Sequence, residues 1–357
     1  PSGFKALCTK DLPDVAVTPS EHFNTITWTG NDTARTVNGV GFQPDFAWIR
    51  NTDITTSHLL FDAIRGAGNA LRSNATTAQS TGATDELTAF AADGLTLGTG
   101  EDVNGNAELI VAWNWKANGT GSANAVGDIT STVSVNTDAG FSIVKYTATG
   151  TTGDTVGHGL GAVPDAIWFK SLTTQSWNCF FPNTIMGATK GLQLDNTSTW
   201  ADVTWMNDTM PTTSVFSLGA NQAATNAYAD GTGQDYIVYC WKNVAGYSSI
   251  GGYLGNGDAD GTFVYTGFRP AFLLLKVTGL DGENWYLFDN KRSTYNLVDD
   301  ALKPDENSAE SSNTAKSVDF LSNGFKVRGS NAAVNQSGYT YVYMAFAETP
   351  FKYSNAR

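Results

Sequence analysis

The stretch Gly41-Phe42-Gln43-Pro44-Asp45-Phe46-Ala47-Trp48-Ile49-Arg50 has two further versions in the chain, at residues 161–170 and 267–276. Each version of this signature segment has a Gly, then a Pro, and then an apolar run that ends on a cation. The three cations are Arg50, Lys170 and Lys276. The copies are almost evenly spaced, and the period exceeds the roughly 20 to 50 residues of a solenoid repeat. We therefore expect a small domain that is present three times.

The sequence around the signature segments predicts the domain boundaries. We expect an N-terminal arm or linker at 1–22, a first β-sandwich repeat at 23–118, a linker and second repeat at 119–246, and a third repeat at 247–357. Short stretches in which apolar and polar residues alternate are separated by Gly, Asn and Asp, which is typical of strands joined by turns. The predicted fold is all-β, with three tandem, jelly-roll-like β-sandwich repeats.

Each repeat closes on a stretch that is apolar at nearly every position, at 109–116, 236–242 and 341–346. This pattern predicts a central strand that is covered on both faces, so we expect Trp113 and Trp115 in a core. In the signature segment we expect the Pro to begin a strand, where its missing N–H costs nothing. The cation at the end of the segment should mark the exit of the strand to solvent.

Composition narrows the class of protein. The 357 residues include 37 Gly, 12% aromatic residues and only 15% charged residues, which favours a turn-rich β-protein with a neutral polar surface. The net charge of −13 argues against nucleic acid and anionic membranes as partners. We found no apolar run of about 18 residues and expect no membrane insertion. The chain begins at Pro1 without Met, so we expect it to derive from a longer or trimmed protein.

Few residues suggest chemistry. The three cysteines are widely spaced and form no zinc pattern, and Cys240 is interpreted as a small buried hydrophobe. The three histidines lack a nucleophile motif and are interpreted as turn or surface residues. They are His22, His58 and His158. Glycoside hydrolysis needs two carboxylates close together, and the sequence does not place the candidate acids Asp62, Glu86, Glu108 and Asp289 side by side. Asp62 and Asp289 occupy equivalent repeat positions, which favours a structural role in a turn.

The segment 200–208 is the predicted ligand surface because it interrupts the repeat pattern. The candidate glycan-binding residues are Trp200, Asp202, Trp205, Asn207 and Asp208. Aromatic faces beside amide and carboxylate groups suit sugar rings, which have apolar CH faces and hydroxyl edges. The alternative is that both Trp side chains pack over an adjacent sheet or a neighbouring subunit.

Asp258-Ala259-Asp260-Gly261 resembles part of a calcium-binding loop, and Asp258 and Asp260 are candidate calcium ligands. The distal Glu of such a loop is missing, so a solvated turn is the alternative. We expect no other cofactor.

Several segments resemble one known family. They are 1–9 with Leu12-Pro13, 41–49, 60–62 with Arg65-Gly66, 111–116, 139–144 and 156–160. They resemble the repeated C-terminal domain of tail-fibre-like virion structural proteins of marine phages, which normally follows a SPRY-type, concanavalin-like domain. The resemblance covers nearly the whole chain, although Ala271 and the segment 200–208 depart from the repeat. It implies a location on a virion surface and a role in host attachment.

From these observations we expect a tail-fibre-like virion surface protein that binds a host receptor, preferably a glycan, without catalysis. The expected partners are other virion proteins and the host glycan. The expected assembly is a homo-oligomer, for which a trimer is one form. The alternative is that the three repeats of one chain themselves form a pseudo-threefold body. Two other functions stay open, a polysaccharide depolymerase and a purely architectural capsid-decorating or scaffold protein.

Overall fold

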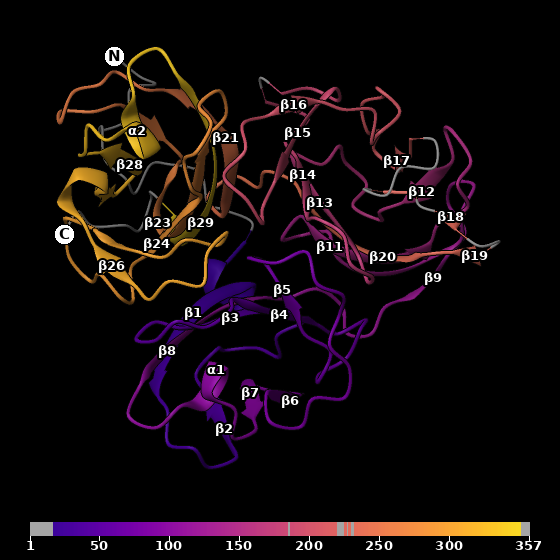
Figure 1. The fold of residues 1–357 in the computed structure, drawn as a ribbon, viewed down its shortest axis with the longest axis horizontal. Coiled ribbons are helices and arrows are strands. Elements are labelled where there is room, and N and C mark those ends of the chain that lie inside the picture. The colour runs from indigo at the N-terminus through magenta and orange to yellow at the C-terminus, as the bar shows by residue number, and fades with distance from the viewer. Residues whose placement is uncertain (1–16, 185, 220–224, 227, 230–231, 351–357) are drawn as a thin grey trace, which may run out of the picture.

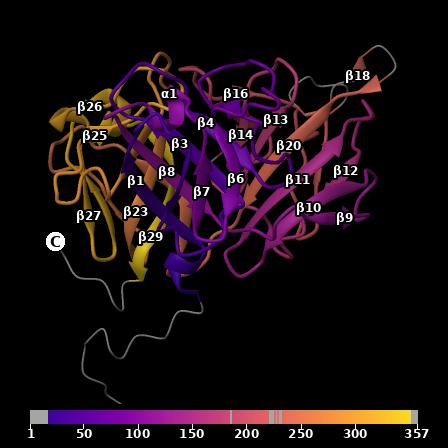
Figure 2. The same ribbon diagram turned by 90° about the horizontal axis from the view of Figure 1, so that it is seen from below.

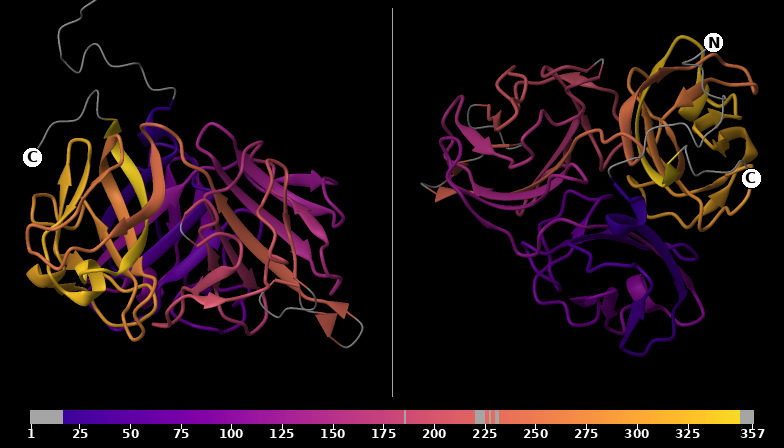
Figure 3. Two further views of the ribbon diagram at one scale, coloured as in Figure 1. Left: turned by 90° about the horizontal axis from the view of Figure 1, so that it is seen from above. Right: turned by 180° about the vertical axis from the view of Figure 1, so that it is seen from behind.

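The computed structural model describes residues 17–350 except 185, 220–224, 227 and 230–231, so most of the predicted arm at 1–22 lies outside the described residues. Almost all regular structure is β, which confirms the predicted all-β fold. Figure 1 shows three lobes around a common centre, and the side views in Figures 2 and 3 show that many of their strands run along the central axis. We call the lobes units 1, 2 and 3.

Unit 1 contains a main sheet and a small sheet. The main sheet has the order β1 (Phe23–Thr29), β8 (Leu109–Trp115), β3 (Phe46–Asn51), β4 (Leu59–Asp62) and β5 (Leu71–Arg72). The small sheet has the order β2 (Arg35–Asn38), β7 (Gly94–Leu97) and β6 (Leu87–Ala91), and the short helix α1 is Glu101–Asn104.

Unit 2 has a longer main sheet. Its order is β16 (Ala201–Asp202), β15 (Lys190–Gln193), β14 (Asn178–Phe180), β13 (Ala166–Ser171), β20 (Asp235–Trp241), β11 (Phe141–Thr147), β10 (Ser131–Asn136) and β9 (Ser122–Asn124). The small sheet pairs β12 (Thr155–Gly157) with β17 (Val215–Ser217), and a separate hairpin pairs β18 (Tyr228–Ala229) with β19 (Thr232–Gly233).

Unit 3 has the main-sheet order β21 (Ser248–Leu254), β29 (Thr340–Pro350), β23 (Phe268–Val277) and β24 (Tyr286–Asp289). Its small sheet has the order β22 (Phe263–Tyr265), β28 (Gly324–Val327) and β27 (Val318–Leu321). The remaining short elements are η2 (Pro19–Glu21), β25 (Asp300–Ala301), β26 (Ser311–Ser312), η3 (Thr314–Lys316) and α2 (Ala332–Asn335).

The three main sheets share one strand order. In each, the closing strand lies between the opening strand and the signature strand, as in β1-β8-β3, β11-β20-β13 and β21-β29-β23. As in a jelly roll, the pair β2 and β7 lies in the sequence inside the pair β1 and β8, and the two pairs are in different sheets. Unlike a jelly roll, β3 and β4 follow one another in the same sheet. Pairing registers then define equivalent positions: Trp48 faces Trp113, Trp168 faces Tyr239, and Leu274 faces Met344.

The closing strands are buried on both faces, as predicted. On β8, Trp113 and Trp115 belong to a central core to which all three units contribute, whereas Ile110 and Ala112 belong to the core inside unit 1. Successive strand residues point to opposite faces, so a strand buried on both must be apolar throughout. Each unit has its own core between its two sheets, and the three main sheets enclose the central core (Figure 1).

The signature segment begins a strand in two units but not in the third. Pro44 and Pro164 precede β3 and β13 as predicted, whereas Pro270 lies inside β23 at a register shift, where a missing N–H is also tolerated. The Asp after the Pro stabilises the connection to the next unit. Asp45 accepts the Ala117 N–H at 2.7 Å, and Asp165 accepts the Asn243 N–H at 2.6 Å. Unit 3 has Ala271 instead, and β29 continues past this point to Pro350.

The predicted exit of the three signature cations to solvent is wrong. Arg50, Lys170 and Lys276 are fully buried because the end of each signature strand abuts another unit. Each cation donates to a main-chain carbonyl across an interface between units. The acceptors are Asn307 for Arg50 at 3.0 Å, Thr76 for Lys170 at 3.2 Å and Thr197 for Lys276 at 3.2 Å. Burial lowers the pKa of Lys170 and of Lys276 to about 8.

A second set of contacts follows the same cyclic pattern. The Trp177 indole N–H of unit 2 donates to the Arg72 carbonyl of unit 1 at 2.7 Å, and Trp285 of unit 3 donates to the Gln193 carbonyl of unit 2 at 2.9 Å. At the equivalent position of unit 1, His58 lies against the main chain of Lys303 in unit 3. The expectation of a surface position is therefore wrong for His58 and His158, since both are fully buried, although His158 does lie in a loop after β12.

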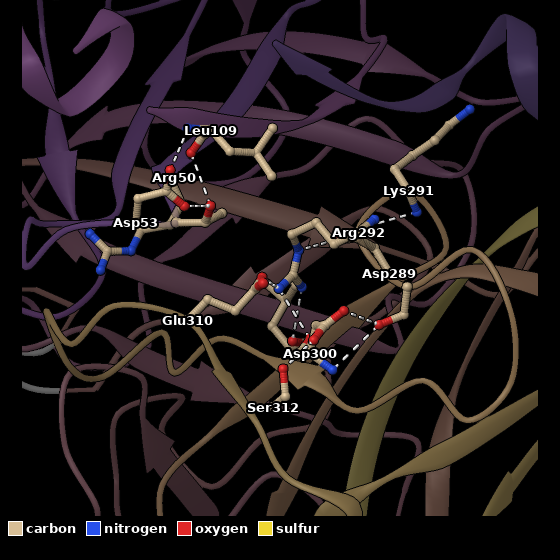
Figure 4. Close-up of polar contacts among 12 residues, drawn as sticks. Arg50, Asp53, Leu109, Asp289, Lys291, Arg292, Asp300, Glu310 and Ser312 are labelled. Atoms are coloured by element: carbon tan, nitrogen blue, oxygen red, sulfur yellow. Dashed lines mark hydrogen bonds and ion pairs between the residues drawn. The ribbon is translucent and has the colours of Figure 1, made fainter. Parts of the chain in front are cut away.

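Asp62 and Asp289 bond turns, as predicted from their equivalent positions. Asp289 accepts the Arg292 main-chain N–H at 2.9 Å and pairs with its guanidinium at 2.6 Å, and Arg292 also contacts Glu310 (Figure 4). The same Asp289 carboxylate accepts the Trp113 indole N–H from unit 1 at 3.1 Å.

At the interface between units 1 and 2, Asp62 pairs with Arg65 and accepts the Tyr239 hydroxyl of unit 2 at 2.7 Å. Trp113 and Tyr239 occupy equivalent positions, so the two interfaces use the same arrangement of carboxylate, guanidinium and donor from the closing strand.

We predict that Asp289→Asn destabilises the protein strongly. It removes one of the two carboxylates that pair with Arg292, the Asp289 and Arg292 side chains are almost fully buried, and breaking one partner of a buried ion pair costs about 3–5 kcal/mol. The control is Asp202→Asn in the exposed Lys190–Asp202 pair, for which we expect about 1 kcal/mol or less. Urea unfolding measures both variants, and equal losses would contradict the structural role of Asp289.

We also predict that His58 makes the protein less stable in acid. Burial, followed by the charges of Arg50 and Arg292, holds the pKa of His58 well below its usual 6.5. The unfolded chain therefore binds a proton below pH 6.5 that the folded chain does not bind. The contribution of His58 is complete above pH 6.5 and is lost as the pH falls.

The comparison is between wild type and His58→Asn, in which the Asn oxygen replaces the imidazole acceptor of the Trp48 N–H. Between pH 7.5 and 5.0, wild type should lose roughly 2 kcal/mol more unfolding free energy than the variant. All other titrating groups are common to both proteins. If unfolding free energy depends on pH in the same way in both proteins, the folded chain protonates His58 as readily as the unfolded chain does, and the prediction is wrong.

Candidate functional site

Trp200, the first residue of the predicted ligand surface, lies at the interface between units 2 and 3. Its main-chain N–H donates to the Thr278 carbonyl at 2.9 Å. Its ring packs against the central core, and the Lys190 ammonium lies 5.7 Å from the ring centre. Equivalent residues make the same main-chain contact at the other interfaces, where Gln79 donates to Leu172 and Glu310 donates to Thr52. The position of Trp200 is therefore part of the contact between units.

Trp205 packs on the opposite face of the same sheet. Its ring meets Phe180 edge to face at 5.6 Å, and it packs against the core inside unit 2, directly over Gly191. A Cβ at Gly191 would lie 2.5 Å from the Trp205 ring, so this packing requires glycine. Trp200 and Trp205 thus contact different cores, and their rings do not form one surface for a sugar, which agrees with the alternative interpretation.

The polar candidates of the segment are also separated by this arrangement. Asp202 is exposed and pairs with Lys190 at 2.6 Å, next to Trp200. Asn207 and Asp208 follow Trp205 in a turn in which both have a positive φ, a conformation that Asn and Asp tolerate better than most residues. Asp202 thus joins Trp200 through Lys190, whereas Asn207 and Asp208 belong to the turn after Trp205.

The candidate calcium ligands have protein partners. The Asp260 carboxylate pairs with Lys326 at 2.5 Å and Arg328 at 3.4 Å, and the hydrogen bond and charge of Lys326 lower the pKa of Asp260. The Asp258 carboxylate accepts the Asp260 N–H at 2.8 Å. In the part of the chain that the structure describes, no group of three or more His, Cys, Asp or Glu is arranged to hold a metal ion.

The remaining acid candidates are engaged separately. Glu86 pairs with Arg72 at 3.5 Å, and Glu108 accepts the Asn51 amide at 2.6 Å. Asp62 and Asp289 form ion pairs with buried arginines at two different interfaces. Each of the four carboxylates thus stabilises a local contact. Cys179 and Cys240 are buried free thiols, which confirms the interpretation of Cys240 as a small buried hydrophobe.

A groove on unit 2 was not foreseen from the sequence. It has a volume of about 360 Å³ and lies beside β9 and β10, which extend the unit 2 main sheet beyond β11. Among the residues that the structure describes, these two strands have no counterpart beyond β1 or β21. Its apolar lining includes Val133, Val135 and the half-exposed Val126. Hydroxyl and amide groups complete the lining, and the residues that supply them are Ser122, Asn124, Thr213 and Ser214.

A second unforeseen feature is an exposed aromatic pair on unit 3. Phe263 and Tyr265 lie on the outward face of β22, with 44% and 63% of their surfaces exposed. Val264 between them packs inward into the core of unit 3. The alternation Phe-Val-Tyr was visible in the sequence, but only the registers of the small sheets show which positions of the other units correspond to it.

Within the described residues, no helix is long and apolar enough to cross a membrane. No curated protein and no solved structure matches the chain. One family model matches residues 18–350, a range that covers all three units as a single domain. The chain therefore belongs to the family described as "Domain of unknown function (DUF7483)".

Proposed function

We propose that this protein is a virion surface protein that attaches to a host by binding a glycan, without catalysing a reaction. The groove on unit 2 carries the glycan-binding part of the proposal. Its valine side chains match the CH face of a sugar ring, its hydroxyl and amide groups match the ring's hydroxyl edge, and none of the described residues that line it is charged. The virion location and tail-fibre-like role rest on the sequence resemblance alone.

The placement of the carboxylates supports binding over hydrolysis. A glycosidase needs two carboxyl groups within about 10 Å of each other across a substrate cleft. Here Asp62 and Asp289 neutralise buried arginines, and Glu86 and Glu108 hold local contacts, so none of the four lines the groove. Asp62 and Asp289 are also fully buried in interfaces between units, so neither carboxylate is accessible to a substrate.

The rigidity of the three-unit body supports an attachment role. Three main sheets share one core, and buried cations link each unit to another, so the outer loops and sheets are held on a fixed frame. A pre-organised surface loses little conformational entropy on binding. Several copies on one particle would raise weak affinities for single sugars through avidity.

The test is a glycan array together with adsorption to host cells, using the full chain. Val126→Arg introduces a long side chain at the groove from a half-exposed position, so folding should be preserved while binding falls at least tenfold. Leu297→Arg, at a similarly exposed apolar position in unit 3, is the matched control and should bind as wild type does.

Three results would overturn the proposal. Equal glycan binding by wild type and Val126→Arg would exclude the groove as the binding site. Shortened glycan products in the incubation mixture would identify a depolymerase. A wild-type protein that binds no glycan and localises to the capsid would identify an architectural role.

A further inference from the structure

The small sheets of the three units differ at two outward positions. The registers make Phe263 of unit 3 equivalent to Thr36 of unit 1, since Phe263 faces Lys326 and Thr36 faces Thr96. Tyr265 corresponds in the same way to Asn38 of unit 1. In unit 2 the two positions are Thr155 and Gly157. Small or polar residues therefore occupy these positions in two units, and exposed aromatic rings occupy them only in unit 3.

The aromatic rings of unit 3 lie on an otherwise regular three-stranded surface. One row across the sheet contains Phe263, Lys326 and Asp319, and the next contains Tyr265, Gly324 and Leu321. Side chains two residues apart on a strand lie on the same face, about 7 Å apart, and we call these two exposed rings together the platform. Gly324, which pairs with Tyr265, adds no side chain to this row, and the Tyr265 ring lies close to Gly267.

A set of charged groups lies at the Phe263 end of the platform. Lys326 and Arg328 both pair with Asp260, and Arg328 also pairs with Asp319 at 3.4 Å. Two cations and two carboxylates thus neutralise each other while they remain partly exposed, so hydrogen-bond donors and acceptors are present without local net charge. This arrangement favours a neutral, hydroxyl-rich ligand over an ionic one.

The size of the platform decides between a sugar and a protein partner. With 44% and 63% of their surfaces exposed, Phe263 and Tyr265 together offer on the order of 200 Å². A stable protein interface needs about 800 Å² on each partner, whereas one or two sugar rings cover an area close to that of the platform. Tyr295, another exposed aromatic among the described residues of this unit, lies in a loop beside the far edge strand, since Asn296 bonds the main chain of Phe320 on β27.

We propose that the outward face of β22 is a saccharide-binding platform, on which Phe263 and Tyr265 stack against the CH faces of a neutral glycan and the Lys326–Asp260–Arg328 group bonds its hydroxyls. The platform rests on the proposed glycan-binding function and adds to it a second site on another unit. Two sites on one rigid body would bind one long polysaccharide with higher avidity than either site alone.

The decisive variant is Phe263→Thr combined with Tyr265→Asn, which gives unit 3 the residues that unit 1 has at the equivalent strand positions. Both side chains point outward, so the fold should be preserved. Tyr295→Asn removes an exposed aromatic outside the platform and is the matched control. The full chain and its variants are run in native gels that contain laminarin, mannan or xylan, with alginate as the anionic comparison.

We expect a neutral polysaccharide to retard the wild type and Tyr295→Asn, and the double variant to lose at least fivefold in affinity. Tyr265→Phe should keep most of the retardation because it preserves the ring. Equal retardation of wild type and double variant would overturn the platform, as would retardation by alginate alone or a wild-type dimer in sedimentation that the double variant lacks. If the array still shows glycan binding that depends on Val126, the platform alone fails and the proposed function remains.

Discussion

The burial of each main sheet on both faces is the constraint on which the rest of the structure depends. A sandwich covers only one face of a sheet, and the other face of β8, β20 or β29 is just as apolar. Leaving large aromatic side chains such as Trp113 and Trp115 in water would cost about 1.5–3 kcal/mol each. A single unit could not cover them. Three units around one core can, and the central cluster is the result.

This arrangement explains why cations are buried at the end of each signature strand. Closing the three units around an axis places the strand ends of one unit against the loop of another, and the carbonyls of that loop need hydrogen-bond donors. Arg50, Lys170 and Lys276 supply them at three equivalent positions. The desolvation that lowers the lysine pKa values is offset by bonds to several carbonyls at once, as Lys170 shows with Thr76 and Gln175.

The pattern of apolar and polar residues along the chain predicts which faces of a strand are buried, but it does not predict which part of the protein covers each face. The apolar run that ends at Trp115 indicates burial on both faces, and this was correct because alternation reports directly on the faces of a strand. The same pattern does not show what covers the second face, so Lys170 was expected in solvent. Trp200 stood out as a break in the repeat. Its main-chain N–H, however, makes the same contact between units as the main-chain N–H of Gln79, a chemically unrelated residue. Main-chain contacts leave no signature in side-chain identity, and for this reason the candidate surface could not be distinguished from an interface.

The third interface shows how the units diverge while the arrangement persists. Asp62 with Arg65 meets Tyr239, and Asp289 with Arg292 meets Trp113. By the strand registers, the equivalent positions at the interface between units 2 and 3 are Phe181, Thr184 and Met344. Phe181 and Met344 belong to the central core. Carboxylate, guanidinium and donor have been exchanged together for apolar or neutral groups, because a carboxylate left there without its partners would be buried and unpaired. The buried ion pair and its donor have therefore changed as a set, whereas an outward position such as Phe263 or Tyr265 needs no charged partner in order to change. A difference between units at an outward position is for this reason better evidence of a binding role than a difference at an interface.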